Sequence, residues 1–119
     1  MEWLDFVGLS EMKDKFAQSL SWGQQKLLSL ARLLCGKFDL LLIDEPVSGV
    51  NPEMIDVILK KIKELKTLGK TIIVVEHNME AVEVISDYIY FMDSGKITES
   101  GLPEEVLKNQ KVMNAYIGI

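Results

Sequence analysis

Two stretches of the chain carry hydrophobic residues at helical spacing. In SWGQQKLLSLARLLCG the recurring positions are Leu27, Leu30, Ala31 and Leu34. In the stretch that follows Pro52 they are Ile55, Ile58, Ile62 and Leu65. Each pattern predicts an amphipathic helix, which Gly36 ends in the first case and Gly69 in the second. Asn51 is expected to cap the second helix, with Pro52 as its first residue.

Three continuously hydrophobic runs alternate with the predicted helices. DLLLID, residues 39–44, is typical of a strand that is buried on both faces of a parallel sheet. TIIVV, residues 71–75, predicts a second buried strand, and YIYFM, residues 88–92, predicts a third. The residues expected in the core here are Met79, Tyr88, Tyr90, Phe91 and Met92. Strands that alternate with helices predict an α/β fold with a mostly parallel sheet.

Caps and turns predict the remaining elements. The first twenty residues are expected to hold a short helical piece, a turn near Gly8 and a second mixed segment. Asn78 can cap a helix that runs to about residue 85. The stretch DSGK predicts a tight turn, after which residues 97–99 pair back as a hairpin. Pro103 is expected to open a short helix, and another is expected at 112–117.

Composition narrows the class of protein. The chain has 119 residues and a net charge of −5, which fits one small globular domain and disfavours nucleic acid or an acidic membrane surface as a direct partner. Its one cysteine, Cys35, cannot form an internal disulfide, which suits a reducing compartment. The longest apolar run is far too short to cross a bilayer, and MEWLDF lacks a signal-peptide pattern. We therefore expect a cytoplasmic protein that acts on any membrane process from outside the bilayer.

Two adjacent acids end the first hydrophobic run, in LLLIDEP. Ligands of open α/β sheets gather outside the carboxyl ends of the strands, where Asp44 and Glu45 are expected to lie. Asp44 is a candidate for binding Mg²⁺, and Glu45 is a candidate general base for an attacking water. A strand that simply ends in a solvated acidic turn explains this stretch about equally well.

The stretch LSWGQQ precedes the first predicted helix. Ser21 and Gln24 have the spacing of a capping box. A helix start is also an anion site, and Gly23 would let a phosphate approach the backbone closely. Taken by itself, the stretch is better explained by a simple N-cap than by a phosphate site.

His77, the one histidine, directly follows the second hydrophobic run and stands beside Glu76. At the carboxyl end of a strand it could donate a hydrogen bond to a phosphate oxygen, although a lone histidine is usually a surface or core residue. The sequence contains no P-loop. LKTLGKT, residues 65–71, has Glu64 where the first P-loop glycine would fall, and it follows a helix instead of a strand.

Taken together and in this order, the motifs resemble those of the nucleotide-binding subunit of ABC transporters. LSWGQQ resembles the family signature, usually LSGGQ, and LLLIDEP resembles Walker B with its catalytic glutamate. SGVNP resembles the D-loop, VVEHNM resembles the switch-histidine region, and IYFMDSGKITESGLPEEV resembles the closing hairpin and helix. The resemblance covers nearly the whole chain, but only the second half of the family's domain.

Within the family, the chain resembles the ATPases of branched-chain and related polar amino acid importers. An aromatic residue in the signature, the asparagine of GVNP, EHNM and the tail VMNAYIG carry this finer resemblance. The chain departs from the general pattern at Trp22, Asn51 and Asn78, where a glycine, an aspartate and an aspartate are usual. Because of these departures, the contacts that the D-loop makes in the family apply less directly to this chain.

The resemblance implies a role for each motif in ATP hydrolysis. Asp44 would hold Mg²⁺, Glu45 would orient or deprotonate the attacking water, and His77 would contact the γ-phosphate. Further nucleotide contacts are implied for Ser21, Trp22, Gly23, Gln24 and Asn51. In the family, ATP lies between two domains that face head to tail, so the signature segment would serve the nucleotide held by the partner.

The resemblance also implies what lies outside this chain. Residues 1–36 would end the helical subdomain, and residues 37–119 would hold Walker B, the D-loop, the switch histidine and the closing elements. The implied partners are an N-terminal half with Walker A, a second nucleotide-binding subunit and a membrane permease, which would place the chain at the inner face of the membrane. Since the P-loop strand would separate the second and third strands, we expect the isolated chain to need that half, self-associate or be partly ordered.

Three other interpretations stay open at this point. The chain could belong to an ABC protein outside transport, acting in translation or DNA repair. It could be a truncated or split interaction module that complements an N-terminal half without hydrolysis of its own. A plain α/β domain with coincidental motifs is the third. For the ABC ATPase half that the motifs resemble, the isolated chain is expected to lack significant ATPase activity, because nothing in it replaces the P-loop.

Overall fold

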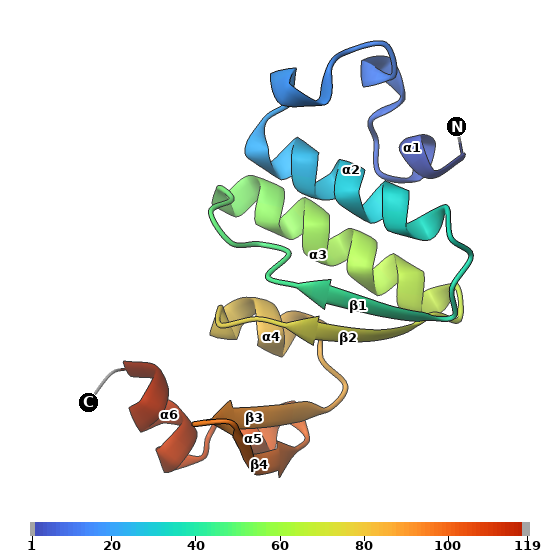
Figure 1. Cartoon of the computed structure of the whole chain (residues 1–119). Coiled ribbons are helices and arrows are strands. Elements are labelled where there is room, and N and C mark those ends of the chain that lie inside the picture. Colours follow the sequence, from blue (N-terminus) through green and yellow to red (C-terminus); the bar gives the residue numbers. More distant parts are fainter. Residues whose placement is uncertain (1, 118–119) are drawn as a thin grey trace. The chain divides into compact units, whose positions relative to one another are not determined.

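The computed structural model describes residues 2–117, which form two compact units joined between Ala81 and Val82 (Figure 1). The elements of the first unit, in chain order, are α1 (Glu2–Phe6), the 3-10 turns η1 (Ser10–Met12) and η2 (Ala17–Ser19), α2 (Trp22–Leu34), β1 (Leu40–Asp44), α3 (Pro52–Thr67) and β2 (Thr71–Val75). Helix α4 (Met79–Ile85) begins in this unit and continues into the second.

The two amphipathic helices form as predicted and lie side by side (Figure 1). Their buried residues are Gly23, Leu27, Leu30, Ala31 and Leu34 in α2, and Ile58, Leu59, Ile62 and Leu65 in α3. Asn51 caps α3, where its Oδ1 accepts from the backbone N–H of Met54 at 2.9 Å, and Pro52 is the first helical residue. Local sequence therefore decides where these helices begin and which face they bury.

Strands β1 and β2 pair in parallel, with Leu40 opposite Thr71 and Asp44 opposite Val75. Helices α2 and α3 lie on one side of this pair (Figure 1), and Leu41, which is 1% exposed, is fully buried. The prediction that both faces are buried is wrong for the described residues. Four apolar side chains form an exposed set, here called the open sheet face: Leu40 (51%), Leu42 (67%), Ile73 (53%) and Val75 (60%).

The second unit is a hairpin with two short helices. Its elements are β3 (Ile89–Asp93), β4 (Lys96–Gly101), α5 (Pro103–Val106) and α6 (Gln110–Ile117). The strands pair antiparallel through the predicted turn, where Ser94 and Gly95 take φ of 49° and 77°. These positive angles fit the mirror-image turns that match the twist of a hairpin. The buried side chains of this unit are Ile89, Val106 and Val112.

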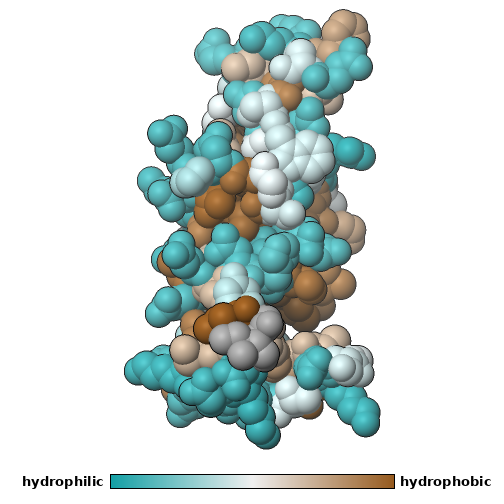
Figure 2. All heavy atoms as spheres, turned by 90° about the vertical axis from the view of Figure 1, so that its left-hand side faces the viewer, coloured by the Kyte–Doolittle hydropathy of each residue, from teal (hydrophilic) through white to brown (hydrophobic). Residues whose placement is uncertain are grey.

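Part of the third hydrophobic run is exposed, contrary to prediction. Tyr88, Tyr90 and Met92 are 52%, 66% and 65% exposed, and the two tyrosine rings lie 5.1 Å apart. Side chains alternate between the faces of a strand, so Tyr90 and Met92 lie on one face of β3 without cover inside their own unit, and Tyr88 directly precedes the strand. Hydrophobic side chains also reach the surface among polar ones in Figure 2.

The strands do not form one sheet. Within residues 2–117, β1 pairs with β2 and β3 pairs with β4, so only half of the pairing is parallel. The gap expected between the second and third strands stays a prediction. The predicted subdomain boundary at residue 36 stays a prediction. No helix among the described residues is both long and apolar enough to cross a membrane.

Candidate functional site

The carboxyl ends of β1 and β2 bring two predicted site residues together. Because these strands are parallel and paired, Glu45 and His77 emerge at the same edge. Their side chains meet with Nδ1 of His77 3.3 Å from Oε1 of Glu45. Both side chains are accessible, with 70% of His77 and 49% of Glu45 exposed. The pair can therefore reach a ligand from solvent, and solvent screening keeps its own attraction weak.

Glu45 has a backbone conformation that side chains rarely adopt. Its φ is 47°, in the left-handed region, which costs a residue other than glycine about 1–3 kcal/mol. Its N–H donates to the carbonyl of Val75 at 2.8 Å. Its carbonyl accepts from Nζ of Lys26 at 2.9 Å and from the N–H of Ser48 at 3.3 Å. The surroundings of Glu45 hold it in this conformation, which turns the chain sharply after β1.

Glu76 joins the loops that follow β1 and β2. One of its carboxylate oxygens accepts from the N–H of Val47 at 3.0 Å. The other accepts from the N–H groups of His77 and Asn78 at 3.0 and 3.2 Å. Bonds from N–H groups to a carboxylate are stronger than neutral ones, so Glu76 fixes the backbone on both sides of the site. The sequence places Glu76 beside His77, but the hydrogen bond between Val47 and the carboxylate of Glu76 could not be predicted from it.

The start of α2 is a complete capping box, as predicted. Oγ of Ser21 accepts from the N–H of Gln24 at 3.2 Å, and Oε1 of Gln24 accepts from the N–H of Ser21 at 2.9 Å. The geometry of a helix leaves the N–H groups of Trp22 and Gly23 without acceptors inside the helix. These two groups are what the segment could offer to an anion, and a phosphate contact here stays a prediction.

Gly23 has a packing role that the sequence does not reveal. A Cβ at this position would stand 2.2 Å from Cγ of Met54, so the glycine allows α2 to approach α3. Gly23 is buried. A need for glycine here is therefore explained by helix packing, whether or not a ligand approaches the backbone.

Trp22 reaches across to the segment between β1 and α3, residues 45–51, which is here called the β1 loop. Its Nε1 donates to the carbonyl of Ser48 at 3.0 Å. The ring also lies against Gly49, where a Cβ would be 3.2 Å from Nε1 and where φ is 71°. Lys26, one helical turn further along α2, has Nζ 5.4 Å from the centre of the same ring. The signature segment and the β1 loop are thus in direct contact.

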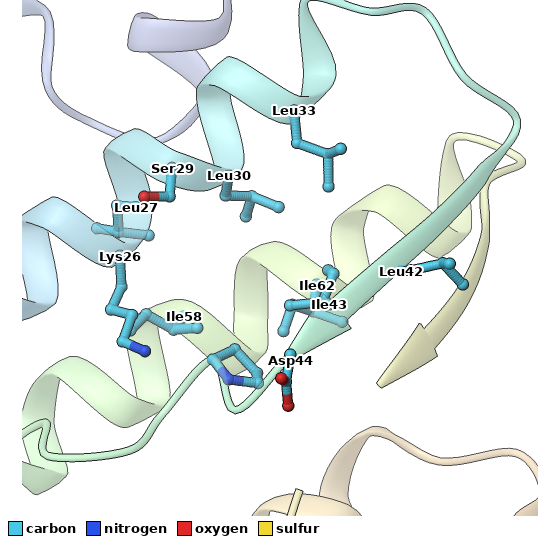
Figure 3. A pocket seen from close by; sticks show the side chains of 11 residues that line it. Lys26, Leu27, Ser29, Leu30, Leu33, Leu42, Ile43, Asp44, Ile58 and Ile62 are labelled. Atoms are coloured by element: carbon cyan, nitrogen blue, oxygen red, sulfur yellow. The ribbon is translucent and has the colours of Figure 1, made fainter. Parts of the chain in front are cut away.

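Asp44 ends β1 with an exposed carboxylate and lines a pocket of about 330 Å³ between α2, β1 and α3 (Figure 3). Most of the lining is apolar, with Leu30, Ile43 and Ile62 among the side chains that converge there in the figure. Lys26 and Asp44 supply charges of opposite sign. The described residues contain no group of three or more His, Cys, Asp or Glu that could hold a metal. Mg²⁺ is commonly held by one or two carboxylates together with water and phosphate oxygens, so a single exposed carboxylate such as Asp44 is compatible with binding it.

The structure brings some of the predicted residues together and leaves others apart. Glu45 meets His77, and Trp22 meets the β1 loop. Ser21 and Gln24 bond each other, and the side chain of Asn51 caps α3. The contacts of Glu76 and Lys26 were not predicted. Lys26 stands four residues after Trp22, so helical spacing alone could have placed the two side chains together.

Comparison with known proteins gives several close matches. A family model described as ABC transporter matches residues 1–48. The chain is 40% identical, over 97% of its length, to a probable branched-chain amino acid transport ATP-binding protein, LivG, of Archaeoglobus fulgidus. It is 39% identical, over 93%, to the arginine transport ATP-binding protein ArgV of Corynebacterium glutamicum. It covers 45% and 44% of these two proteins, so it spans about half the length of the relatives it matches.

Solved structures agree with these matches. A nucleotide-free ATP-binding cassette from an ABC transporter superposes with a TM-score of 0.91 at 34% identity, covering 99% of this chain and 48% of that one. The ADP conformation of an ATP-binding cassette gives the same TM-score, identity and coverage. The chain aligns with the C-terminal half of its relatives.

Proposed function

We propose that this chain supplies half of the machinery that hydrolyses ATP to drive transport. The chain belongs to the family of ABC transporter ATP-binding domains and matches their C-terminal half. The observation that supports this best is the meeting of Glu45 and His77 at the shared carboxyl edge of β1 and β2. Ligands of such sheets gather at this edge.

Glu45 and His77 have complementary tasks in this proposal. The carboxylate of Glu45 accepts a hydrogen bond from the attacking water and orients it, or removes its proton, as a general base. A ring N–H of His77 donates to an oxygen of the γ-phosphate. Their side chains lie 3.3 Å apart, so both can reach the same phosphate group and water. Catalysis of phosphoryl transfer depends mainly on such positioning and on electrostatic stabilisation.

Asp44 fits the place of a magnesium-binding carboxylate. It is exposed at the end of β1, directly before Glu45, and carboxylate oxygens are ligands that Mg²⁺ prefers. Bound Mg²⁺ would neutralise charge on the phosphates. Asp44 would hold it together with phosphate and water oxygens, the ligands that usually complete a magnesium site.

The signature segment is assigned to a second nucleotide. Ser21 and Gln24 shape the start of α2 by bonding each other, which leaves the N–H groups of Trp22 and Gly23 directed out of the helix end. These groups and the helix dipole would contact ATP held by a partner domain. Asn51 and the rest of the β1 loop would lie at the same head-to-tail interface.

The chain is proposed to act together with a segment equivalent to the N-terminal half of its relatives, from the same polypeptide or another. Two observations support this. The chain covers 45% of the Archaeoglobus relative, and the open sheet face leaves Leu40, Leu42, Ile73 and Val75 at the surface. Exposed apolar sets of this kind commonly mark an interface. The N-terminal half would supply both the P-loop and the cover for this face.

Transport of amino acids is the proposed task of the complete assembly. Two of the relatives bear names of branched-chain amino acid and arginine transport proteins. The assembly would include a second ATP-binding subunit and a membrane permease, which would hold this chain at the cytoplasmic face of the membrane. An ABC protein outside transport remains the alternative, and binding to the permease of an amino acid importer separates the two.

Phosphate release from MgATP tests the proposed activity. The chain is measured alone and after mixing with a polypeptide that carries the N-terminal half of the Archaeoglobus relative. We expect no turnover by the chain alone and turnover by the mixture. Glu45→Gln should lower the rate of the mixture by about 100-fold or more, in line with loss of a general base. Glu11→Gln, with the same change of charge at an exposed position, serves as the control.

Two outcomes would contradict parts of the proposal. Turnover by the pure chain that Glu45→Gln abolishes would show that no N-terminal half is needed. A stable complex without turnover would favour an interaction module that does not hydrolyse ATP.

A further inference from the structure

We propose that Trp22 and Lys26 are positioning residues, which together clamp the β1 loop to the start of α2 and so hold Glu45 in its left-handed conformation. The inference rests on the proposed function for its catalytic consequence, but the clamp itself is a structural claim that can be tested separately. Neither residue is placed in contact with the reacting atoms by this proposal.

The clamp holds the β1 loop at two separate points. Nζ of Lys26 donates to the carbonyl of Glu45 at 2.9 Å, at the beginning of the loop. Nε1 of Trp22 donates to the carbonyl of Ser48 at 3.0 Å, three residues later. Both donors come from the first two turns of α2. Two fixed carbonyls on either side of a tight turn restrict its rotation far more than one would.

The two side chains of the clamp also support each other. Nζ of Lys26 lies 5.4 Å from the centre of the Trp22 ring, within the range of a cation–π contact. Residues four apart on a helix face the same side, so the contact follows from the helix itself. The ring therefore helps to aim the ammonium group at the carbonyl of Glu45.

Other contacts also hold the loop between the two points of the clamp. Val47 is 3% exposed, and its N–H donates to Glu76 at 3.0 Å. Glu45 and Gly49, on either side, are exposed, and both have positive φ, at 47° and 71°. Gly49 leaves room for the ring, since a Cβ there would stand 3.2 Å from Nε1 of Trp22. Of these two positions only Glu45 is strained, because glycine adopts positive φ without penalty, and α2 bonds the carbonyl of Glu45.

The clamp joins two segments of the chain that are assigned to different nucleotides. Trp22 and Lys26 flank Gly23 and Gln24 in the segment assigned to the partner's nucleotide. Glu45 is assigned to the nucleotide of its own domain. The two hydrogen bonds of the clamp therefore join the segment assigned to one ATP to the loop that carries the carboxylate assigned to the other.

Amide hydrogen exchange of the full chain tests the clamp without any need for ATP hydrolysis. Trp22→Phe keeps an aromatic ring but removes the donor, and Lys26→Met removes the charge. Each should speed the exchange of the amides of Glu45 and of residues 47–50 by about two- to tenfold, the range expected for loss of one hydrogen bond. Trp3→Phe and Lys63→Met are matched controls that should leave this loop unchanged. Lys26→Arg, which retains a donor, should restore most of the protection.

Unchanged exchange at Glu45 and residues 47–50 in both clamp variants would overturn the proposal. An equal acceleration in α3, residues 52–67, would also overturn it, because the residues would then support the whole unit instead of the loop. A loss of protection that is confined to the loop and restored by Lys26→Arg supports it.

Kinetics of the mixture with the N-terminal half test the catalytic consequence. Lys26→Met and Trp22→Phe should lower kcat by about threefold or more with KM for MgATP nearly unchanged, because the ground-state nucleotide contacts are retained. A rise in KM with kcat unchanged would overturn the positioning role. Absence of turnover by the unmodified mixture would count against the proposed function and would leave the exchange result standing.

Discussion

The two faces of the β1–β2 sheet have nearly the same kind of residues and very different surroundings. Leu41 lies under the helices and is 1% exposed, whereas its neighbour Leu42 is 67% exposed. Strand alternation sends these two leucines to opposite sides. The difference teaches that a run such as LLLI states how hydrophobic a strand is, but which of its faces finds a cover depends on what else is packed there.

The largest effect is expected on the covered face. Leu41→Ala should lower the free energy of unfolding by about 2–5 kcal/mol, because it removes buried contacts and leaves a cavity among the helices. Urea denaturation of the chain, followed by far-UV circular dichroism, measures the loss. A change below about 1 kcal/mol would mean that this face is less tightly packed than the structure indicates.

The open sheet face should matter for association. Leu42→Lys combined with Ile73→Lys should weaken binding of the N-terminal half by at least about tenfold, since two charges would have to be buried in an apolar contact. Isothermal titration calorimetry measures the affinity. The matched control is the double variant Lys60→Met and Lys63→Met on α3. It also alters two charges, but at positions outside the open sheet face. Equal affinity for the lysine variant and the original chain would mean that the N-terminal half does not dock there.

An intermediate effect on stability is expected at the start of α2, the helix that lies on the covered side of the β1–β2 sheet. Ser21→Ala should lower the free energy of unfolding by about 1 kcal/mol, because the N–H of Gln24 loses its acceptor. Urea denaturation measures it alongside Ser29→Ala, which removes a hydroxyl from the middle of the same helix and should cost less. Equal losses in the two variants would argue against a capping role for Ser21.

The smallest effect is expected from Leu42→Ala. With two thirds of the side chain already exposed, its removal should change the free energy of unfolding by no more than about 0.5 kcal/mol. The same urea experiment compares it directly with Leu41→Ala. A loss as large as that of Leu41→Ala would mean that the open sheet face is covered in solution, for instance by a second copy of the chain.

Much of the fold could be predicted because its signals are local. Asn51 and Ser21 accept hydrogen bonds three residues ahead, so sequence spacing alone identifies both caps. The buried positions of α2 follow directly from helical periodicity. The positions of Glu45 and His77 at one edge follow from two parallel strands of equal length. Each of these inferences needs only neighbouring residues or one strand pair.

Predictions failed where a residue's surroundings come from distant segments. Tyr90 and Met92 were expected in the core and are exposed, because hydrophobicity does not state which elements are available to cover them. The bond from Glu76 to Val47 spans 29 positions, and no periodic pattern marks it. Trp22 was a departure from the usual signature without an explanation, and its bond to Ser48 supplies one.

The sequence by itself determined the helices, the strands, their caps and the order of motifs that places the chain in its family. These depend on short-range geometry, which repeats every turn of a helix or every second residue of a strand. Only the tertiary structure decided that Gly23 is needed for the approach of Met54 and that α2 holds the carbonyl of Glu45. Contacts of this kind join segments far apart in the chain, so they are set by how the elements pack and not by any local pattern.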